Sequence, residues 1–214
     1  MIPRWHEDNS RRPSDVNEHL NTDYKYASQC ESVIEYSAQP FSGTLTSLAA
    51  GLLNNGSTVK KLYYVNPGQF NVAELAQACC TEGVTLKLYQ QKTHLHKLEA
   101  PVDMACIRGW HCYKQVLLEL ENLVDTKKYI LLHDSKIDEF VSESVRCGAN
   151  CKALAVQNGW KLTDVQRGIW PAIEKFVEDH KEWVIKEKFD NNNGLTVLER
   201  IAAAPVPSTD NSSC

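Results

Sequence analysis

The stretch Met104-Ala-Cys-Ile-Arg-Gly-Trp-His-Cys-Tyr113, together with Ile130-Leu-Leu-His-Asp-Ser135, decides the fold. Each part is a short apolar run that ends abruptly in polar residues, with His111 after the first run and Asp134 after the second. Apolar residues recur at helical spacing between positions 113 and 125, which predicts a helix between two strands. In such a β-α-β unit, the right-handed crossover brings the ends of both strands to one edge of a parallel sheet. Ligands of open α/β sheets bind at this carboxyl edge, so we expect a functional site there.

The rest of the chain continues the alternation of strands and helices. Runs of alternating or continuous apolar residues predict strands, and apolar residues at helical spacing predict helices. The predicted strands are 33–36, 61–66 and 84–89, and the predicted helices are 14–28, 44–53, 72–81 and 170–177. Two further apolar segments, 183–189 and 195–201, flank an Asn/Gly-rich turn and predict a β-hairpin. We therefore predict an α/β fold: a Rossmann-like, doubly wound, mostly parallel seven-stranded sheet with a C-terminal antiparallel β-hairpin.

The length of 214 residues and the hydrophobic content of 43% predict one domain with a substantial core. We expect residues 1–13 to form an N-terminal arm and residues 14–203 the domain itself. Residues 136–167 show little periodicity, and a segment this long after the fifth strand is typical of a cap insertion over a site. Residues 204–214 are rich in Pro, Ser and Asn, which predicts a disordered tail.

Composition also excludes several classes of function. The formal net charge of −4, without a basic cluster, argues against nucleic-acid binding. No apolar run approaches the roughly 18 residues of a membrane span, and the N-terminus is too polar for a signal peptide. The eight cysteines contain no Cys-x-x-Cys pair, so we expect reduced thiols in a cytoplasmic protein, with neither disulfides nor zinc. The sequence leaves a homodimer open.

Seven motifs carry a family resemblance. In chain order they are Pro13-Ser-Asp-Val-Asn-Glu-His-Leu20, Tyr24-Lys-Tyr-Ala27, Val33-Ile-Glu35, Gly109-Trp-His-Cys-Tyr113, Tyr129-Ile-Leu-Leu-His-Asp134, Gly168-Ile-Trp-Pro-Ala-Ile173 and Asn191-Asn-Asn-Gly-Leu-Thr-Val-Leu-Glu-Arg200. Together they resemble a family of small class I S-adenosylmethionine (SAM)-dependent methyltransferases from large DNA viruses and bacteria. That family is related to cephalosporin-hydroxylase-like and macrolide-sugar O-methyltransferases. The resemblance spans residues 12–201, and a viral origin would place the protein in the host cytoplasm.

The resemblance implies transfer of a methyl group from SAM to a hydroxyl, often on a sugar. At the end of the fourth strand the family carries Asp-x-x-His, in which the Asp serves a divalent metal and the His is a general base. His111 matches this base, and Asp134 matches a metal ligand after the fifth strand. Arg108 stands where the first Asp is expected. Because a guanidinium cannot ligate a cation, this residue argues against the usual metal dependence.

The resemblance also implies cofactor contacts at the strand ends, but this chain departs from the family pattern there. The expected Gly-rich turn after the first strand contains a single glycine, Gly43. Where the family has an acidic residue that binds the ribose, this chain has Asn66. The position expected to face adenine carries Gln91, followed by Lys92. Amides can still hydrogen-bond a nucleoside, without charge assistance. The candidate cofactor residues are Glu35, Ser37, Gly43, Asn66, Gln91 and Trp110.

Each candidate also has a purely structural interpretation. His111 could be a strand-end histidine bonded to backbone, Asp134 could pair with Arg108, Asn66 could be a turn former, and Trp110 could belong to the core. Two functions therefore stay open. One is a SAM-dependent O-methyltransferase acting on a small acceptor such as a sugar or glycan. The other is a catalytically degenerate protein of the same fold that serves as a binding or assembly module, as the departures at the Gly-poor turn, Asn66, Lys92 and Arg108 would indicate.

Overall fold

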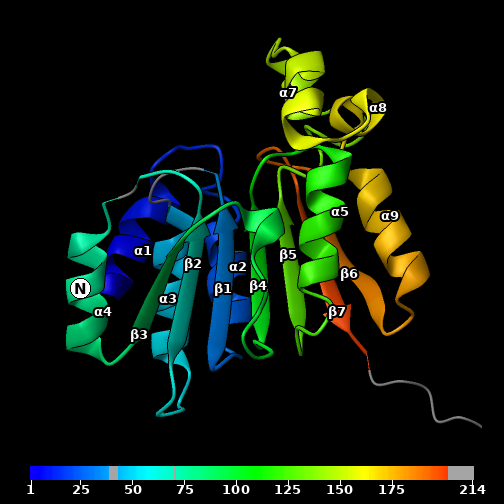
Figure 1. Cartoon of the computed structure of the whole chain (residues 1–214). Coiled ribbons are helices and arrows are strands. Elements are labelled where there is room, and N and C mark those ends of the chain that lie inside the picture. The colour runs from blue at the N-terminus through cyan, green and yellow to red at the C-terminus, as the bar shows by residue number, and fades with distance from the viewer. Residues whose placement is uncertain (39–42, 70, 202–214) are drawn as a thin grey trace, which may run out of the picture.

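A computed structural model describes residues 1–38, 43–69 and 71–201, and the strands of this part of the chain form one mixed sheet (Figure 1). Its order is β3-β2-β1-β4-β5-β7-β6. Strands β1 to β5 pair in parallel, whereas β7 runs antiparallel to both β5 and β6. The strands are β1 (Ser32–Ser37), β2 (Lys61–Asn66), β3 (Thr85–Gln90), β4 (Met104–Arg108), β5 (Tyr129–His133), β6 (Trp183–Phe189) and β7 (Leu195–Arg200). The predicted fold class, including the C-terminal hairpin, is confirmed.

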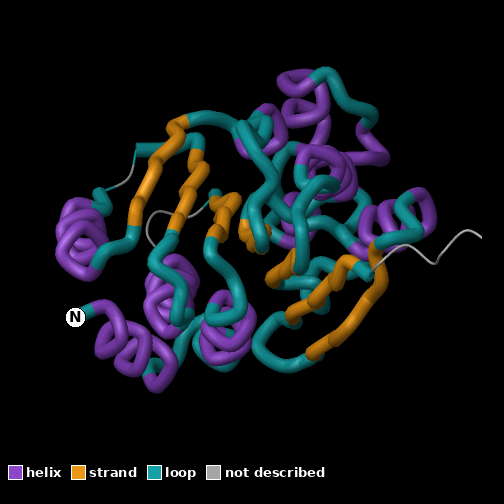
Figure 2. The backbone as a smooth tube through the Cα atoms, turned by 90° about the horizontal axis from the view of Figure 1, so that it is seen from below, coloured by secondary structure: helices purple, strands orange, loops and turns teal. Residues whose placement is uncertain are grey.

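Helices cover both faces of the sheet (Figure 2). The central strands β4 and β5 are buried along their whole length, because helices pack on each side of them. One face packs against α1 to α4, and the other packs against α5 and α9. The helices are α1 (Ile2–Arg11), α2 (Leu20–Ala27), α3 (Gly43–Asn54), α4 (Ala73–Glu82), α5 (Tyr113–Asn122), α6 (Glu143–Arg146), α7 (Cys151–Asn158), α8 (Leu162–Gln166) and α9 (Trp170–Asp179), with a short 3₁₀ turn, η1, at Thr93–Leu95.

The N-terminal region differs from the sequence prediction. Within residues 1–13, which we expected to form an arm, residues Ile2–Arg11 form helix α1, which buries Ile2 and His6 and bonds the His6 Nδ1 to the Ser47 hydroxyl of α3 at 2.8 Å. The helix expected over 14–28 is wrong in its first part, since α2 begins only at Leu20. In the turn before α2, the Ser14 hydroxyl accepts from the backbone N–H of Val16 at 3.4 Å.

Residues 136–167 form a cap of short helices, α6 to α8, above the carboxyl ends of the strands (Figure 1). Despite its weak periodicity, the segment forms α6 at Glu143–Arg146 and α7 at Cys151–Asn158. A small apolar cluster of Cys151, Ala155 and Val165 holds the cap together, and Trp110 of the sheet edge packs against it. The tail predicted over 204–214 lies outside the described residues. Within the described part of the chain, no helix combines the length and the apolar character that crossing a membrane requires.

The turn of the C-terminal hairpin connects distant parts of the chain. Asn192, Asn193 and Gly194 all have positive φ angles, of 46°, 70° and 95°, which Asn and Gly tolerate best. The Asn193 carbonyl accepts from the backbone N–H groups of Lys136 and Ile137, each at 2.9 Å. The neighbouring turn residues also bond to the segment before α2, through a 2.8 Å contact of the Asn191 carbonyl with His19 and a 2.9 Å bond from Asn192 to the Ser14 carbonyl. The sequence indicated only a turn that reverses the chain. In the structure the turn also bonds to the segment before α2 and to the start of the cap.

Candidate functional site

The site begins at the carboxyl edge, where β4 and β5 end side by side. His111 follows β4 and Asp134 follows β5, and their side chains meet there with Nε2 and Oδ2 3.7 Å apart. The right-handed crossover through α5 explains this proximity, as the sequence predicted. Asp134 has a φ of 56°, a left-handed conformation that Asp adopts more readily than most residues, and it turns the chain from β5 into the cap.

His111 is buried, with 6% of its surface exposed, and carboxylates surround it. Its Nδ1 lies 3.2 Å from Oδ2 of Asp138 and 3.9 Å from Oε2 of Glu143. Its Nε2 has no hydrogen-bond partner among the described residues. Burial alone would lower the pKa of His111, but the hydrogen bond to Asp138 and the charges of Asp134 and Glu143 outweigh it, so the pKa is raised above 6.5. The His111 ring hydrogen-bonds to the side chain of Asp138. The alternative that this histidine bonds only to the backbone is therefore wrong.

Asp138 is a site residue that the sequence did not reveal. It is fully buried and accepts two hydrogen bonds from Arg146, at 2.7 and 3.0 Å, in addition to the contact with His111. Burial would raise the pKa of Asp138, yet the hydrogen bonds from His111 and Arg146 lower it below its ordinary value. The carboxylate therefore stays ionised and links the strand-end histidine to helix α6 of the cap.

Arg108, the other unusual residue of this edge, is 4% exposed. Its Nη2 lies 3.4 Å from Oδ2 of the exposed Asp15, in the segment before α2. The sequence left open a pairing of Arg108 with Asp134. In the structure the carboxylate that pairs with Arg108 is that of Asp15.

A cavity of about 220 Å³ lies at the ends of β1, β2 and β4. Its described lining residues are Ser37, Ala38, Pro67, Lys92, Thr93, His94, Trp110, Gln115, Leu154, Gln157 and Asn158, so the cap forms its outer wall. Trp110 stacks on Trp160 of the cap, with ring centroids 5.6 Å apart, and its Nε1 donates to the Ser144 hydroxyl at 2.7 Å. The cap thus fixes the orientation of Trp110. His111 is the next residue in the chain but does not belong to this lining.

The remaining cofactor candidates take different positions. Glu35 is buried in β1, in register with Tyr64 and Cys106 of the neighbouring strands. Asn66 at the end of β2 is also buried; its Nδ2 donates to the Tyr64 hydroxyl at 3.0 Å, and its Oδ1 accepts from the Gly68 N–H at 2.8 Å. The Gly68 bond is the turn chemistry that the sequence offered as the alternative for Asn66.

Neither Gly43 nor Gln91 is among the described residues that line the cavity. Gly43 begins α3, where an added Cβ would lie 3.0 Å from Cδ1 of Leu20. Gln91 is exposed, whereas the next residue, Lys92, lines the cavity and donates from Nζ to Oδ1 of Asn158 at 3.1 Å. This bond closes the cap over the strand ends.

A second residue that the sequence did not reveal lies beneath the cavity. Glu119 of α5 is fully buried and accepts hydrogen bonds from Thr93 and, at 2.7 Å, from Nε2 of Gln115. Burial is the main cause that raises the pKa of Glu119, to about 7, against these hydrogen bonds. The polar pair Gln115 and Glu119, one helical turn apart among apolar positions, was the sequence signal for this network.

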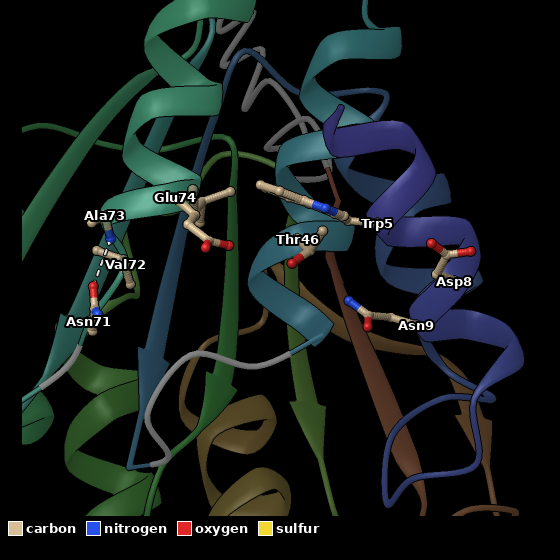
Figure 3. Close-up of a pocket in the computed structure, with 9 residues that line it drawn as sticks. Trp5, Asp8, Asn9, Thr46, Asn71, Val72, Ala73 and Glu74 are labelled. Atoms are coloured by element: carbon tan, nitrogen blue, oxygen red, sulfur yellow. Dashed lines mark hydrogen bonds between the residues drawn. The ribbon is translucent and has the colours of Figure 1, made fainter.

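A larger cavity of about 600 Å³ lies elsewhere, between α1, α3 and the start of α4 (Figure 3). Trp5 points from α1 toward Glu74 and Val72 across this space (Figure 3). Despite its size, we place the site at the smaller cavity, because that one lies where parallel strands end and is lined by Trp110, the neighbour of His111 in the chain.

No family profile and no curated protein sequence matches the chain. Solved structures do resemble it. A protein from Corynebacterium glutamicum has a TM-score of 0.55 at 11% identity, over 96% of this chain and 91% of that one. The Podospora anserina methyltransferase PaMTH1, bound to S-adenosylhomocysteine, gives 0.54 at 11%, over 94% and 88%.

A third similar structure is the 1,6-didemethyltoxoflavin-N1-methyltransferase of Burkholderia thailandensis, with bound 1,6-didemethyltoxoflavin and S-adenosylhomocysteine. It has a TM-score of 0.53 at 10% identity, over 88% of this chain and 79% of that one. The chain has a methyltransferase fold. At these identities the similarity establishes the fold and not the substrates, so the chemistry of this methyltransferase-like chain has to be argued from its own residues.

Proposed function

We propose that this chain is a SAM-dependent O-methyltransferase that transfers a methyl group to a hydroxyl of a small acceptor, of the sugar or glycan class. The observation that carries the proposal is the state of His111. Asp138 holds its Nδ1, and no described residue hydrogen-bonds its Nε2 at the edge where ligands of this fold class bind. A histidine fixed in this way has the tautomer that a general base needs.

The residues at the cavity fit the chemistry of the cofactor. Ring faces of Trp110 and Pro67 offer apolar surface for a base, and Ser37, Thr93 and Lys92 offer polar groups around it. The cavity of about 220 Å³ is smaller than the roughly 300–1,000 Å³ of most ligand sites. We therefore expect the cap to move outward on binding, by opening the bond between Lys92 and Asn158.

When bound, SAM supplies an electrophilic methyl group on a sulfonium. The chain's own contribution is to position the acceptor oxygen and to remove its proton. With SAM bound, the acceptor oxygen would displace the sulfide of SAM at the methyl carbon, and Nε2 of His111 would take the proton of the hydroxyl. The imidazolium is stabilised by Asp138 through Nδ1 and by the Asp134 carboxylate 3.7 Å from Nε2. Positioning supplies most of the acceleration of such a direct displacement.

The class of acceptor rests on the family resemblance to macrolide-sugar O-methyltransferases. The role proposed for Asp134 is electrostatic and does not require a metal ion, in keeping with Arg108 at the position of the family's metal-binding Asp.

The first test is binding of S-adenosylhomocysteine to the full chain, followed by thermal shift and by tryptophan fluorescence, since Trp110 lines the cavity. At about 100 times its dissociation constant, the ligand should stabilise the fold by about 2.7 kcal/mol. The second test is transfer of labelled methyl from SAM to a panel of mono- and oligosaccharides. If millimolar S-adenosylhomocysteine changes neither the melting temperature nor the fluorescence, the chain is not a methyltransferase. That result would fit the alternative of a binding or assembly module.

A further inference from the structure

One carboxylate, one thiol and one imidazole meet in the core, on the α2 face of the sheet. They belong to Asp23 of α2, Cys106 of β4 and His133 of β5, and one potential ligand atom of each lies within 4.8 Å of the others. All three side chains are at most 1% exposed. Among the described residues this is the group of three His, Cys, Asp or Glu side chains that could hold a metal ion, and Asp134 is not part of it.

The polar atoms of this group are incompletely satisfied. Oδ1 of Asp23 lies 3.1 Å from Nε2 of His133, but Oδ2 of Asp23 has no hydrogen-bond partner among the described residues. A buried carboxylate oxygen without a partner costs free energy, so a sequence that keeps it there calls for a compensating group.

We propose that Asp23, Cys106 and His133 bind a divalent transition-metal ion of the zinc class. Thiolate, imidazole and carboxylate are the three ligand types that zinc takes in proteins, and a sulfur ligand disfavours magnesium and calcium. The charges balance, because one carboxylate and one thiolate neutralise a divalent cation. The 3.1 Å between the oxygen and the nitrogen is close to the roughly 3.3 Å between ligands on a tetrahedral zinc with bonds of about 2.0 Å.

If Asp23 binds through both carboxylate oxygens, its Oδ2 gains the partner it lacks, and the site has three protein residues as ligands in a geometry distorted from tetrahedral. His19, whose ring lies 5.9 Å from that of His133, is not part of the set, because its Nε2 contacts the Asn191 carbonyl at 2.8 Å. With every ligand from the protein and no solvent access, the site is structural. It ties α2 to β4 and β5 directly below the carboxyl edge. The ligands lie far apart in the sequence, which explains why cysteine spacing gave no sign of zinc.

The test uses the full chain, purified without a metal-affinity tag. We expect one zinc ion per chain by elemental analysis, a lower melting temperature after treatment with a strong chelator, and recovery when Zn²⁺ is returned. Replacing the metal with Co²⁺ should give a thiolate-to-cobalt absorption band in the folded wild-type chain. The absence of both zinc and this band overturns the proposal, whatever any variant does.

Variants assign the site. Cys106→Ser should lose the stoichiometric zinc and the cobalt band, whereas Cys30→Ser, which removes another fully buried thiol, should keep both. Zinc that persists in Cys106→Ser would come from other groups, such as the exposed Cys80 or Cys147, and would overturn the assignment.

Discussion

The imidazole of His111 and the carboxylate of Asp138 lie 3.2 Å apart, and through this contact the cap holds the residue at the end of β4. Asp138 is fully buried, and Arg146 of α6 binds it from the other side. The pair sets both the tautomer and the pKa of the histidine, so its consequences can be measured on catalysis and on stability.

Replacing His111 with Ala should remove the proposed base while leaving the proposed cofactor cavity intact, since His111 does not line it. We expect binding of S-adenosylhomocysteine to persist and the methyl-transfer rate to fall by about 100-fold or more. The matched control is His180→Ala, a histidine at the end of α9 that contacts Glu121 instead of the site. Loss of binding in His111→Ala, or an unchanged rate, would contradict the role of this residue.

The rate of methyl transfer should increase with pH, because His111 must be neutral to accept a proton and its pKa is raised above 6.5. Asp134→Asn removes one of the charges that raise this pKa, so the rising limb should move to lower pH. The exposed Asp179, paired with Lys175 on α9, provides the control Asp179→Asn, which should leave the limb in place. A limb that does not move in Asp134→Asn would show that this carboxylate does not act on His111.

Glu119 should make the free energy of unfolding depend on pH. Its pKa is about 7 in the folded chain against 4.5 ordinarily, so the folded state binds more protons between these values and stability falls as the pH rises through them. Glu119→Gln should abolish this part of the dependence and stabilise the chain above pH 7 by on the order of 1–3 kcal/mol. Urea unfolding at several pH values measures it. Glu121→Gln, on the exposed side of the same helix, should behave like the wild type; equal profiles for both variants would refute the assignment.

Arg146→Ala should loosen the cap, because it leaves the buried Asp138 with His111 as its remaining charged partner. Loss of a partner from a fully buried pair costs about 3–5 kcal/mol, but Arg146 is 39% exposed, so we expect about 1–2 kcal/mol. The midpoint of urea unfolding reports the change. Arg4→Ala removes a long contact of 3.9 Å between exposed side chains and should have no measurable effect. Equal midpoints for the two variants would argue against the bidentate pair.

Most of the sheet could be predicted from the sequence, because its central strands are apolar runs closed by turn residues. Lys61–Asn66, for example, is the strand that the pattern predicted. The proximity of His111 to Asp134 also followed from local pattern plus the handedness of the crossover. These inferences need information from neighbouring residues only.

The failures involve contacts between distant segments. Helix α1 has few apolar residues and is held by tertiary packing of Ile2 against the core, which no local pattern encodes. Asp138 sits in an aperiodic segment, and its importance appears only once Arg146 and His111 surround it. His96 is buried, and its Nδ1 contacts the hydroxyl of Tyr36, a residue 60 positions away in the chain, at 2.9 Å.

The hairpin turn that bonds to Lys136 and to the Ser14 carbonyl has a consequence for biosynthesis. A ribosome releases β6, this turn and β7 after every other described element, so the segments that flank the carboxyl edge cannot be joined while they emerge. The bonds that this turn makes to Lys136 and Ser14 therefore form only after β6 and the turn have emerged, when the parallel strands β1 to β5 are already outside the ribosome.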